Sequence, residues 1–189
     1  MPKLYFRHGT MNSSKTANLL MVAHNYRAQN KKVILMKPSI DVRFGENTIT
    51  SRAVEGMEAD IIIDPNDSVF NIDLDNVHCI LVDEAQFLSE NNVEGLRELT
   101  RYTPVMCYGL RTDYRSKLFP GSKRLLELAD SIEEIKTICV KCSNKAIINA
   151  KFYYSEYNQK IILRDGDGAV ELGAEERYQP MCWSCWQEK

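Results

Sequence analysis

The sequence has no long hydrophobic run. Among its 189 residues, no stretch approaches the roughly 18 consecutive apolar residues that cross a bilayer. The first residues, MPKLYFRHGT, also lack the apolar segment of a signal peptide. We therefore expect a cytoplasmic protein with no membrane partner.

An excess of positive charge is absent as well. The chain carries 24 Lys and Arg against 26 Asp and Glu, so its formal charge is -2 and no strongly basic surface is expected to attract a nucleic-acid backbone. Hydrophobic residues still make up 44% of the chain, which is ordinary for a globular protein and too high for a disordered one. We expect a folded protein with no nucleic-acid partner.

Strand and helix patterns alternate over most of the chain. The runs that predict strands are residues 3–7, 32–36, 61–63, 77–83 and 105–110, and those that predict helices are residues 15–29 and 89–100. This alternation predicts an α/β fold with a mainly parallel sheet and helices on both faces. Residues 41–56 are polar with little periodicity, and they predict a mobile loop between the second and third strands.

The pattern changes near residue 137. Two Cys-x-x-Cys pairs follow, together with β-prone segments at residues 152–157 and 160–164 and an Asp-Gly-Asp-Gly turn at 165–168. We therefore expect an α/β domain over residues 1–136 and a small β-rich lobe over residues 137–189.

Residues 9–16 have the pattern of a phosphate-binding loop. They are Gly9, Thr10, Met11, Asn12, Ser13, Ser14, Lys15 and Thr16. The octet follows the Walker A pattern G-x-x-x-x-G-K-[ST], except that Ser14 stands in place of the second glycine. In such a loop, backbone N–H groups and the Lys ammonium hold phosphates, and the Thr hydroxyl holds Mg²⁺ at a helix N-terminus. On the octet alone, a turn before a solvated helix is the alternative.

A later apolar strand ends in two acids. The run from Cys79 to Val82 is followed by Asp83 and Glu84, as in a Walker B strand, and this supports a P-loop (RecA-like) fold. Adjacent strand residues point to opposite sides, so the acids can have different roles. Asp83 suits Mg²⁺, and Glu84 can accept a proton as a general base. A hydroxyl acceptor would make the protein a kinase and water an NTPase, while a helix-capping pair is the structural alternative.

Four cysteines have metal-site spacing. Cys139, Cys142, Cys182 and Cys185 form two C-x-x-C knuckles, and four thiolates so arranged bind a structural Zn²⁺ tetrahedrally. The metal would clamp the base of the roughly 39-residue segment between the knuckles, and we expect it to fix both ends of that segment, while Lys15, Thr16 and Asp83 depend on the sheet. Two pairs of redox-active or free thiols are the alternative.

The ordered set of motifs resembles one enzyme family. The set consists of the Walker A octet, VDEAQF at residues 82–87, YGLRTDYR at 108–115, the cysteine knuckles and GAEERY at 173–178. With it the chain is similar, over nearly its whole length, to the zinc-containing cytosolic thymidine kinases of bacteria and animals. The resemblance implies ATP-dependent phosphorylation of the 5′-hydroxyl of thymidine or deoxyuridine in nucleotide salvage for DNA synthesis, with ATP, Mg²⁺ and a structural Zn²⁺.

The resemblance also implies roles for individual residues. Those that match nucleotide-binding positions are residues 9–16 with Asp41, Val42, Arg43, Asp83, Glu84, Ala85 and Gln86. Glu84 matches the base that takes the 5′-hydroxyl proton. Those that match nucleoside-binding positions are Met11, Phe87, Tyr114, Tyr178 and the lasso-like loop of Ala169, Val170, Glu171, Leu172 and Gly173. Taken alone, Met11 and Phe87 would more often be core residues.

Assembly and regulation follow only from the resemblance, which implies a homotetramer and feedback inhibition by dTTP. Two other functions stay open at this point. One is a P-loop ATPase that couples hydrolysis to movement of the zinc lobe. The other is a non-enzymatic zinc-containing binding module with a degenerate phosphate loop.

Overall fold

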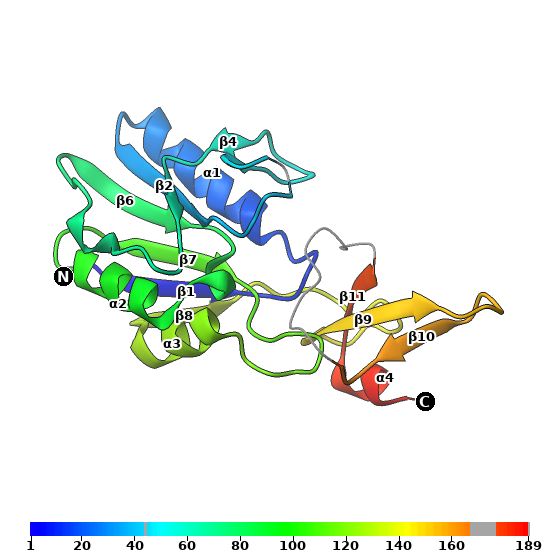
Figure 1. Ribbon diagram of the computed structural model, residues 1–189. Helices are drawn as coiled ribbons and strands as arrows, with labels where there is room; N and C mark the ends of the chain where they lie inside the picture. Colours follow the sequence, from blue (N-terminus) through cyan, green and yellow to red (C-terminus); the bar gives the residue numbers. More distant parts are fainter. Residues whose placement is uncertain (44, 167–176, 189) are drawn as a thin grey trace.

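The main element of the structure, a computed structural model that describes residues 1–43, 45–166 and 177–188, is a six-stranded sheet. Its order is β5-β2-β6-β7-β1-β8, and every neighbouring pair is parallel (Figure 1). The strands are β1 Leu4–His8, β2 Lys32–Pro38, β5 Ile61–Ile63, β6 Val77–Val82, β7 Val105–Gly109 and β8 Ser131–Glu134. Because all the strands are parallel, their carboxyl ends share one edge.

Helices cover both faces of this sheet. They are α1 Lys15–Ala28 on one face, and α2 Glu90–Leu99 and α3 Pro120–Leu128 on the other (Figure 1). In β2, Val33 and Leu35 belong to the core under α1, while Ile34 and Met36 belong to the core under α2. Burial of both faces explains why the strand is a continuous apolar run. The predicted α/β fold is confirmed.

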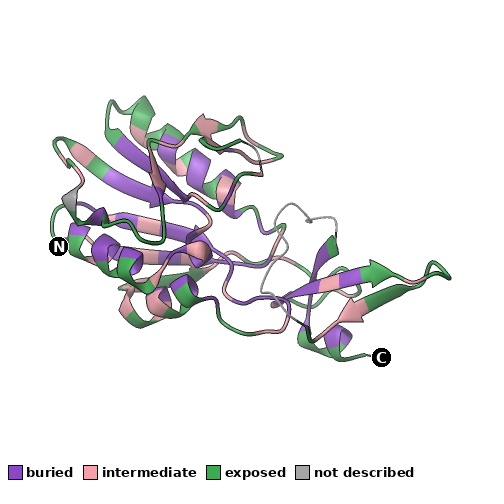
Figure 2. Cartoon of the chain, viewed as in Figure 1, coloured by how far each residue is buried: buried purple, intermediate pink, exposed green. Residues whose placement is uncertain are grey.

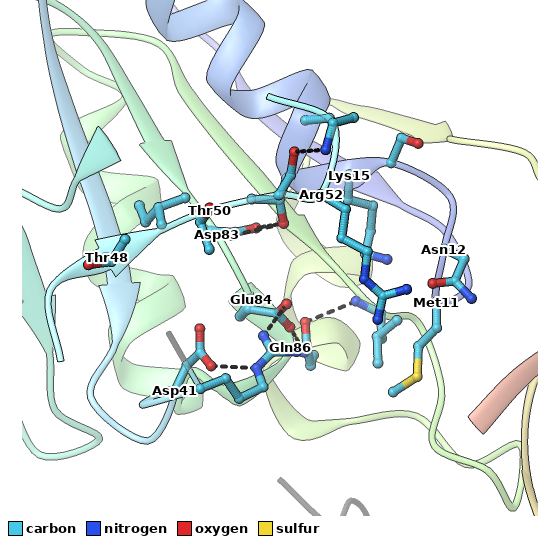
Figure 3. Close-up of a pocket in the computed structure, with 18 of the residues that line it drawn as sticks. Met11, Asn12, Lys15, Asp41, Thr48, Thr50, Arg52, Asp83, Glu84 and Gln86 are labelled. Atoms are coloured by element: carbon cyan, nitrogen blue, oxygen red, sulfur yellow. Dashed lines mark hydrogen bonds and ion pairs between the residues drawn. The ribbon is translucent and has the colours of Figure 1, made fainter. Parts of the chain in front are cut away.

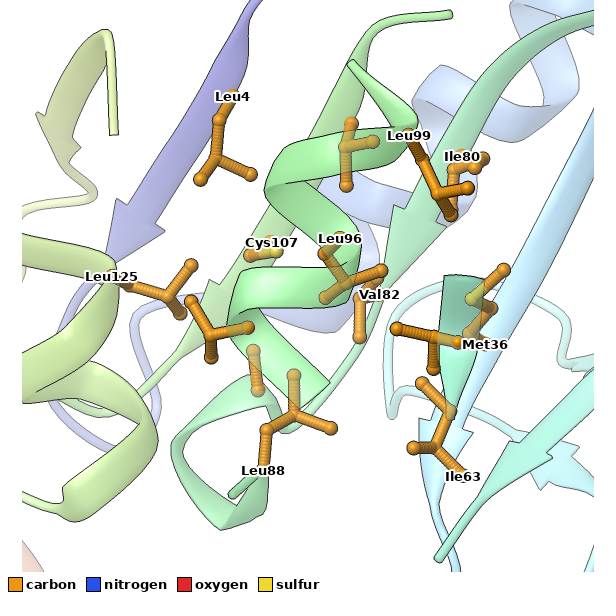
Figure 4. Packing of buried hydrophobic residues seen from close by; sticks show 14 of the residues in the cluster. Leu4, Met36, Ile63, Ile80, Val82, Leu88, Leu96, Leu99, Cys107 and Leu125 are labelled. Atoms are coloured by element: carbon orange, nitrogen blue, oxygen red, sulfur yellow. The ribbon is translucent and has the colours of Figure 1, made fainter. Parts of the chain in front are cut away.

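The larger core lies between the sheet and helices α2 and α3. Leu96, Leu99 and Leu125 of these helices pack with Ile80 and Val82 of β6 (Figure 4), and each is at most 3% exposed. Figure 2 shows the same distribution, with buried residues along the central strands and exposed ones on the outer helix surfaces. No described helix has both the length and the apolarity that a membrane span needs.

A second sheet lies beyond the carboxyl edge of the first (Figure 1). In it, β9 Ile148–Tyr154 pairs on both sides with antiparallel strands, β10 Lys160–Leu163 and β11 Tyr178–Met181, and α4 Trp183–Gln187 follows. Its small core combines Ile148, Ala150 and Met181 with cysteines and Trp186. The predicted β-rich lobe is therefore present.

A short hairpin lies within the segment that the sequence predicted to be a loop. β3 Thr48–Ile49 pairs with β4 Met57–Glu58 in a short antiparallel ladder, so the loop prediction is wrong at residues 48–49. The ladder has an apolar anchor, because Ile49 is 2% exposed and packs, like Met57, in the core under α1. A single buried residue gives no detectable period in sequence.

Helix α3 and strand β8 were not predicted. Gly121 in the first turn of α3 allows close packing, since a Cβ there would lie 2.6 Å from the Ala85 carbonyl oxygen. β8 is an edge strand that pairs with β1, and its two glutamates give it no apolar run in the sequence. Both elements are short, so packing rather than local pattern defines them.

Candidate active site at the carboxyl edge of the parallel sheet

A cavity of about 420 Å³ opens at the carboxyl edge of the six-stranded sheet (Figure 3). Its walls come from the segments after β1, β2, β6 and β7, which meet there although they are far apart in sequence. Ligands of open α/β sheets bind at this edge, because the loops that follow the strands converge on it.

The loop between β1 and α1 has the backbone of a phosphate-binding loop. A Cβ at Gly9 would lie 2.4 Å from the Ile135 carbonyl oxygen, so only glycine fits. Asn12 and Ser14 adopt φ of 62° and 63°. Ser14, at the position of the second Walker glycine, thus holds the left-handed conformation that glycine favours.

Polar groups gather inside this loop. Lys15 is buried, and its Nζ donates to the Thr10 carbonyl oxygen at 2.9 Å. The hydroxyls of Thr10 and Ser13 are buried and have no hydrogen-bond partner among the described residues. Buried hydroxyls normally have hydrogen-bond partners, so two unsatisfied hydroxyls in the same octet as Lys15 fit a loop that receives an anion.

Thr16 and Asp83 meet at the floor of the cavity. The Thr16 hydroxyl donates to the Asp83 carboxylate, 3.0 Å from Oδ2 and 3.2 Å from Oδ1. Burial and the neighbouring Glu84 carboxylate raise the pKa of Asp83 to about 7. A hydroxyl and a carboxylate at contact distance are the oxygen ligands that Mg²⁺ prefers, and a bound cation would favour the ionised carboxylate. The pair therefore fits Mg²⁺.

The Glu84 carboxylate is held on both oxygens. Its Oε1 accepts from Arg43 Nη2 and its Oε2 accepts from Gln86 Nε2, each at 2.5 Å (Figure 3). Gln86 is itself oriented, because its Oε1 accepts from the Leu110 N–H at 2.9 Å. Glu84 has a φ of 48°, a conformation that costs energy outside glycine and often marks functional sites.

Arg43 connects Glu84 to Asp41. Arg43 Nε donates to Asp41 Oδ1 at 2.6 Å, and the Lys37 ammonium lies 3.5 Å from Asp41 Oδ2. Burial alone would raise the pKa of Asp41, but the hydrogen bond and charge of Arg43 and the Lys37 charge hold it below its usual value. Burial alone would lower the pKa of Arg43, but the charges and hydrogen bonds of Glu84 and Asp41 raise it above its usual value. Arg43 is thus a fixed cation that a phosphate could attract away from Glu84.

Three residues that match nucleoside-binding positions border the cavity. Met11, Phe87 and Tyr178 line it, together with Leu110. The Phe87 ring packs edge-on against Phe119, with ring centroids 5.8 Å apart at 76°. The cavity thus has an apolar part beside the carboxylates, as a nucleoside base requires.

Tyr114, another predicted nucleoside-binding residue, is buried and does not line the described part of the cavity. The cations of Arg115 and Lys151 lie over its ring, 5.6 and 5.4 Å from the ring centroid. Residues 169–173 fall outside the described residues.

Of three further described residues predicted to bind the nucleotide, one lines the cavity and two do not. Asn12 lines the cavity. Val42 is exposed, and Ala85 is buried in the core under α2, so neither side chain belongs to the described cavity wall. Contacts at these two positions would involve backbone groups.

Sequence reasoning missed one wall of the cavity. Residues 48–53 line it, and the Lys37 ammonium donates to the carbonyl oxygens of Gly45 and Thr48 beside this segment. Arg52 adds a cation to this wall (Figure 3). The available signal was a polar, Arg-containing insertion directly after a strand, at the edge where ligands bind.

The four cysteines form a cluster in the second sheet. All four Sγ atoms of Cys139, Cys142, Cys182 and Cys185 lie within 4.8 Å of one another, and Cys142 Sγ is 3.6 Å from both Cys182 Sγ and Cys185 Sγ. Tetrahedral Zn–S bonds of about 2.3 Å require sulfur atoms about 3.8 Å apart, whereas a disulfide requires about 2 Å. The cluster fits zinc.

The four cysteines affect one another's protonation. Backbone N–H groups outweigh burial and lower the pKa of Cys139 to about 6, whereas neighbouring sulfurs raise the pKa of Cys185. Four thiolates at this spacing therefore need a cation among them. The zinc interpretation is favoured over free thiol pairs.

Known proteins place the chain in a family. A family model described as thymidine kinase matches residues 2–186. The chain is 43% identical over 195 residues to the thymidine kinase of Lactococcus lactis subsp. lactis, with 96% of this chain and 95% of that protein covered. It is 41% identical over 186 residues to the thymidine kinase of Streptococcus gordonii, with 96% and 94% covered. For the Chromobacterium violaceum thymidine kinase, the identity is 40% over 195 residues, with 98% of each chain covered. This chain belongs to the thymidine kinase family, as its ordered motifs predicted.

Proposed function

We propose that the chain transfers the γ-phosphoryl group of ATP to the 5′-hydroxyl of thymidine, and of deoxyuridine, in nucleotide salvage for DNA synthesis. The observation that carries the proposal is that the phosphate-binding loop, the Thr16–Asp83 pair and Glu84 line the same cavity as Met11 and Phe87. Family membership supplies the chemical class of the acceptor.

The phosphate side of the reaction belongs to the loop after β1. Its backbone N–H groups and the Lys15 ammonium hold the β and γ phosphates at the N-terminus of α1. Thr16 and Asp83 hold Mg²⁺, which when bound neutralises charge on the phosphates. Arg43 moves its guanidinium from Glu84 toward the phosphates, since both are anionic partners within one cavity.

Glu84 serves the acceptor side. Its carboxylate takes the proton of the 5′-hydroxyl, the 5′-oxygen forms a bond to the γ-phosphorus, and the bond between that phosphorus and the β–γ bridging oxygen breaks. The products are the nucleoside monophosphate and ADP, and the proton passes from Glu84 to solvent. Gln86 keeps one carboxylate oxygen in place through its own contact with the Leu110 N–H.

The base side combines Met11, Phe87 and Tyr178 of the cavity wall with the backbone of residues 169–173 and with Tyr114, a buried aromatic residue. We assign Zn²⁺ to Cys139, Cys142, Cys182 and Cys185 as a structural ion, because four protein ligands leave no position open for catalysis.

The division of the chain at residue 136 is part of this proposal. The Ile135 N–H donates to the His8 carbonyl oxygen at 2.7 Å, which ends the parallel sheet, and the Cys139 N–H donates to Asn144 at 2.8 Å, which begins the first knuckle. Residues 1–136 then form the P-loop ATP-binding domain, and residues 137–189 form the zinc lobe that carries the lasso-like substrate loop.

Assembly, regulation and location follow from the family resemblance alone. They are a homotetramer, feedback inhibition by dTTP, and a cytoplasmic location. Light scattering of the purified chain tests the first, and loss of activity on addition of dTTP tests the second.

One assay separates the proposed function from the alternatives. ADP release from Mg·ATP is measured with and without thymidine, and we expect release that depends on thymidine and matches thymidine monophosphate formed. Equal ADP release without nucleoside would support the P-loop ATPase. No release in either case would support the non-enzymatic zinc module.

A further inference from the structure

Asn149 of β9 lies between two segments of the active site. It is 3% exposed, and both ends of its side-chain amide are used. Its Oδ1 accepts from the Met11 N–H at 2.7 Å, and its Nδ2 donates to the Thr112 carbonyl oxygen at 3.0 Å. The first contact reaches the phosphate-binding loop, and the second reaches the segment after β7.

The Met11 contact falls at a point where the loop needs support. Two residues of the octet, Asn12 and Ser14, are non-glycine residues in the left-handed region, so the loop backbone carries conformational strain. Strained backbone persists where surrounding contacts over-determine it. Asn149 supplies such a contact directly before the first strained residue, and it does so from the other sheet.

Asn149 is in turn fixed by the strand that leads to the second cysteine knuckle. β11 pairs with β9 so that Pro180 lies opposite Asn149, and Cys182 follows one residue after the strand ends. The Val140 N–H in the first knuckle donates to the Pro180 carbonyl oxygen at 3.0 Å. A continuous path of backbone pairing thus joins both knuckles to Asn149.

We infer that Asn149 is a positioning residue through which the zinc lobe sets the conformation of the phosphate-binding loop. The inference rests on the proposed function, because it assumes that residues 9–16 bind ATP phosphates. It extends the role of zinc beyond the segment between the knuckles, because Asn149 of that segment accepts a hydrogen bond from Met11 of the loop.

The test compares two buried amides of the same small sheet. Asn149→Leu keeps approximately the volume of the side chain and removes both bonds. Gln179→Leu is the matched control, because Gln179 is 8% exposed and its side-chain hydrogen bonds, to Lys160 and Met181, stay within the lobe. Each zinc-loaded variant is analysed for bound zinc, for affinity toward Mg²⁺ with a non-hydrolysable ATP analogue, and for hydrogen exchange of the Met11 amide.

We expect Asn149→Leu to retain zinc, to bind the analogue about tenfold more weakly, and to lose protection of the Met11 amide, because an unpaired buried N–H is costly. Gln179→Leu should change neither the affinity nor the exchange. A protected Met11 amide and unchanged affinity in Asn149→Leu would overturn the inference while leaving the proposed function intact. A wild-type chain that binds no ATP analogue would instead overturn the proposed function and this inference with it.

A second measurement needs no substitution and covers the case in which Asn149→Leu does not fold. Zinc is removed from the wild-type chain by a chelator, and analogue affinity and Met11 exchange are followed. The inference predicts weaker analogue binding and faster Met11 exchange. Unchanged values in the zinc-free chain would overturn it.

Discussion

The two sheets of the molecule are stabilised in different ways. The six-stranded sheet buries a large apolar core on each face, and the segments at its carboxyl edge are continuations of buried strands. The three-stranded sheet has a small core in which cysteines take a large share, and Tyr154 and Tyr157 beside it are 59% and 85% exposed. Apolar burial can stabilise the first sheet, whereas the second has a small core and a cysteine cluster that fits a structural zinc ion.

This difference has a functional counterpart. The groups proposed to bind phosphate lie at strand ends of the parallel sheet that share an edge. The residues proposed to bind the base come from both regions, because Met11 and Phe87 follow strands of the parallel sheet and Tyr178 belongs to the lobe. Asn149 makes the two regions one site rather than two adjacent ones.

Loss of zinc should have the largest effect. In Cys185→Ser we expect bound zinc to fall to nearly none and thymidine binding to disappear, because a structural Zn²⁺ contributes roughly 10 to 16 kcal/mol in isolated zinc-finger peptides. ATP binding should weaken by only about tenfold, through Asn149. Elemental analysis and calorimetry measure these changes. Cys107→Ala, a buried thiol of the parallel sheet, is the control that should keep zinc. Normal thymidine binding without zinc would show that the lobe does not hold the base.

Loss of the proposed base should be the next largest effect. Glu84→Gln keeps the shape of the side chain and is expected to lower kcat by about 10² to 10⁴, the usual contribution of a positioned base, with little change in ATP and thymidine affinity. Glu94 of α2 is also paired with an arginine, Arg124 of α3, so Glu94→Gln is the control and should leave kcat unchanged. Retention of wild-type kcat by Glu84→Gln would exclude Glu84 as the base.

Substrate choice tests the base side of the comparison. The ring N3 and the amino group of deoxycytidine reverse the hydrogen-bond pattern of thymine. Its kcat/KM should therefore be lower than that of thymidine by about 10² or more, because buried polar groups of the pocket would stay unpaired. Thymidine should be preferred over deoxyuridine only modestly, because deoxyuridine lacks one methyl group. Burial of a methyl group in an apolar pocket such as that of Met11 and Phe87 contributes roughly 1 to 3 kcal/mol to discrimination between substrates. Steady-state kinetics with the three nucleosides measures both. Similar kcat/KM values for deoxycytidine and thymidine would remove the base-pocket assignment.

Ser14→Gly should produce the smallest change. Glycine adopts the φ of 63° found there without a Cβ penalty, and non-glycine residues in that region cost on the order of 1 kcal/mol. ATP affinity measured by calorimetry should stay the same or increase by a few-fold. Asn12→Gly, at φ 62° in the same loop, is the matched control for backbone relaxation alone. A clear loss of affinity confined to Ser14→Gly would identify the Ser14 hydroxyl as a phosphate ligand.

The sequence predicted the parallel sheet well, because its strands are apolar runs and its site residues directly follow them. Asp83 and Glu84 could be located from the end of β6 alone. The cysteine cluster was predictable for a similar reason, since C-x-x-C spacing is a local pattern that reports a non-local site.

What the sequence did not predict depends on contacts between distant segments. Nothing near Asn149 distinguishes it from other polar strand residues, and its role becomes visible only when Met11 and Thr112 lie on either side of it. The wall at residues 48–53 was missed because the hairpin there is anchored by one buried residue, Ile49, and one apolar residue gives no hydrophobic periodicity in the sequence. Tyr114 was assigned by its motif, and its role in binding stays a prediction, because it is buried and does not line the described part of the cavity.

The most direct test of the account is a crystal structure of the zinc-loaded chain with thymidine, Mg²⁺ and a non-hydrolysable ATP analogue. The account predicts the phosphates on residues 9–16, the base beside Met11 and Phe87, and the 5′-oxygen at about 2.6 to 3.2 Å from the Glu84 carboxylate. A 5′-oxygen remote from Glu84, with thymidine bound outside this cavity, would contradict it.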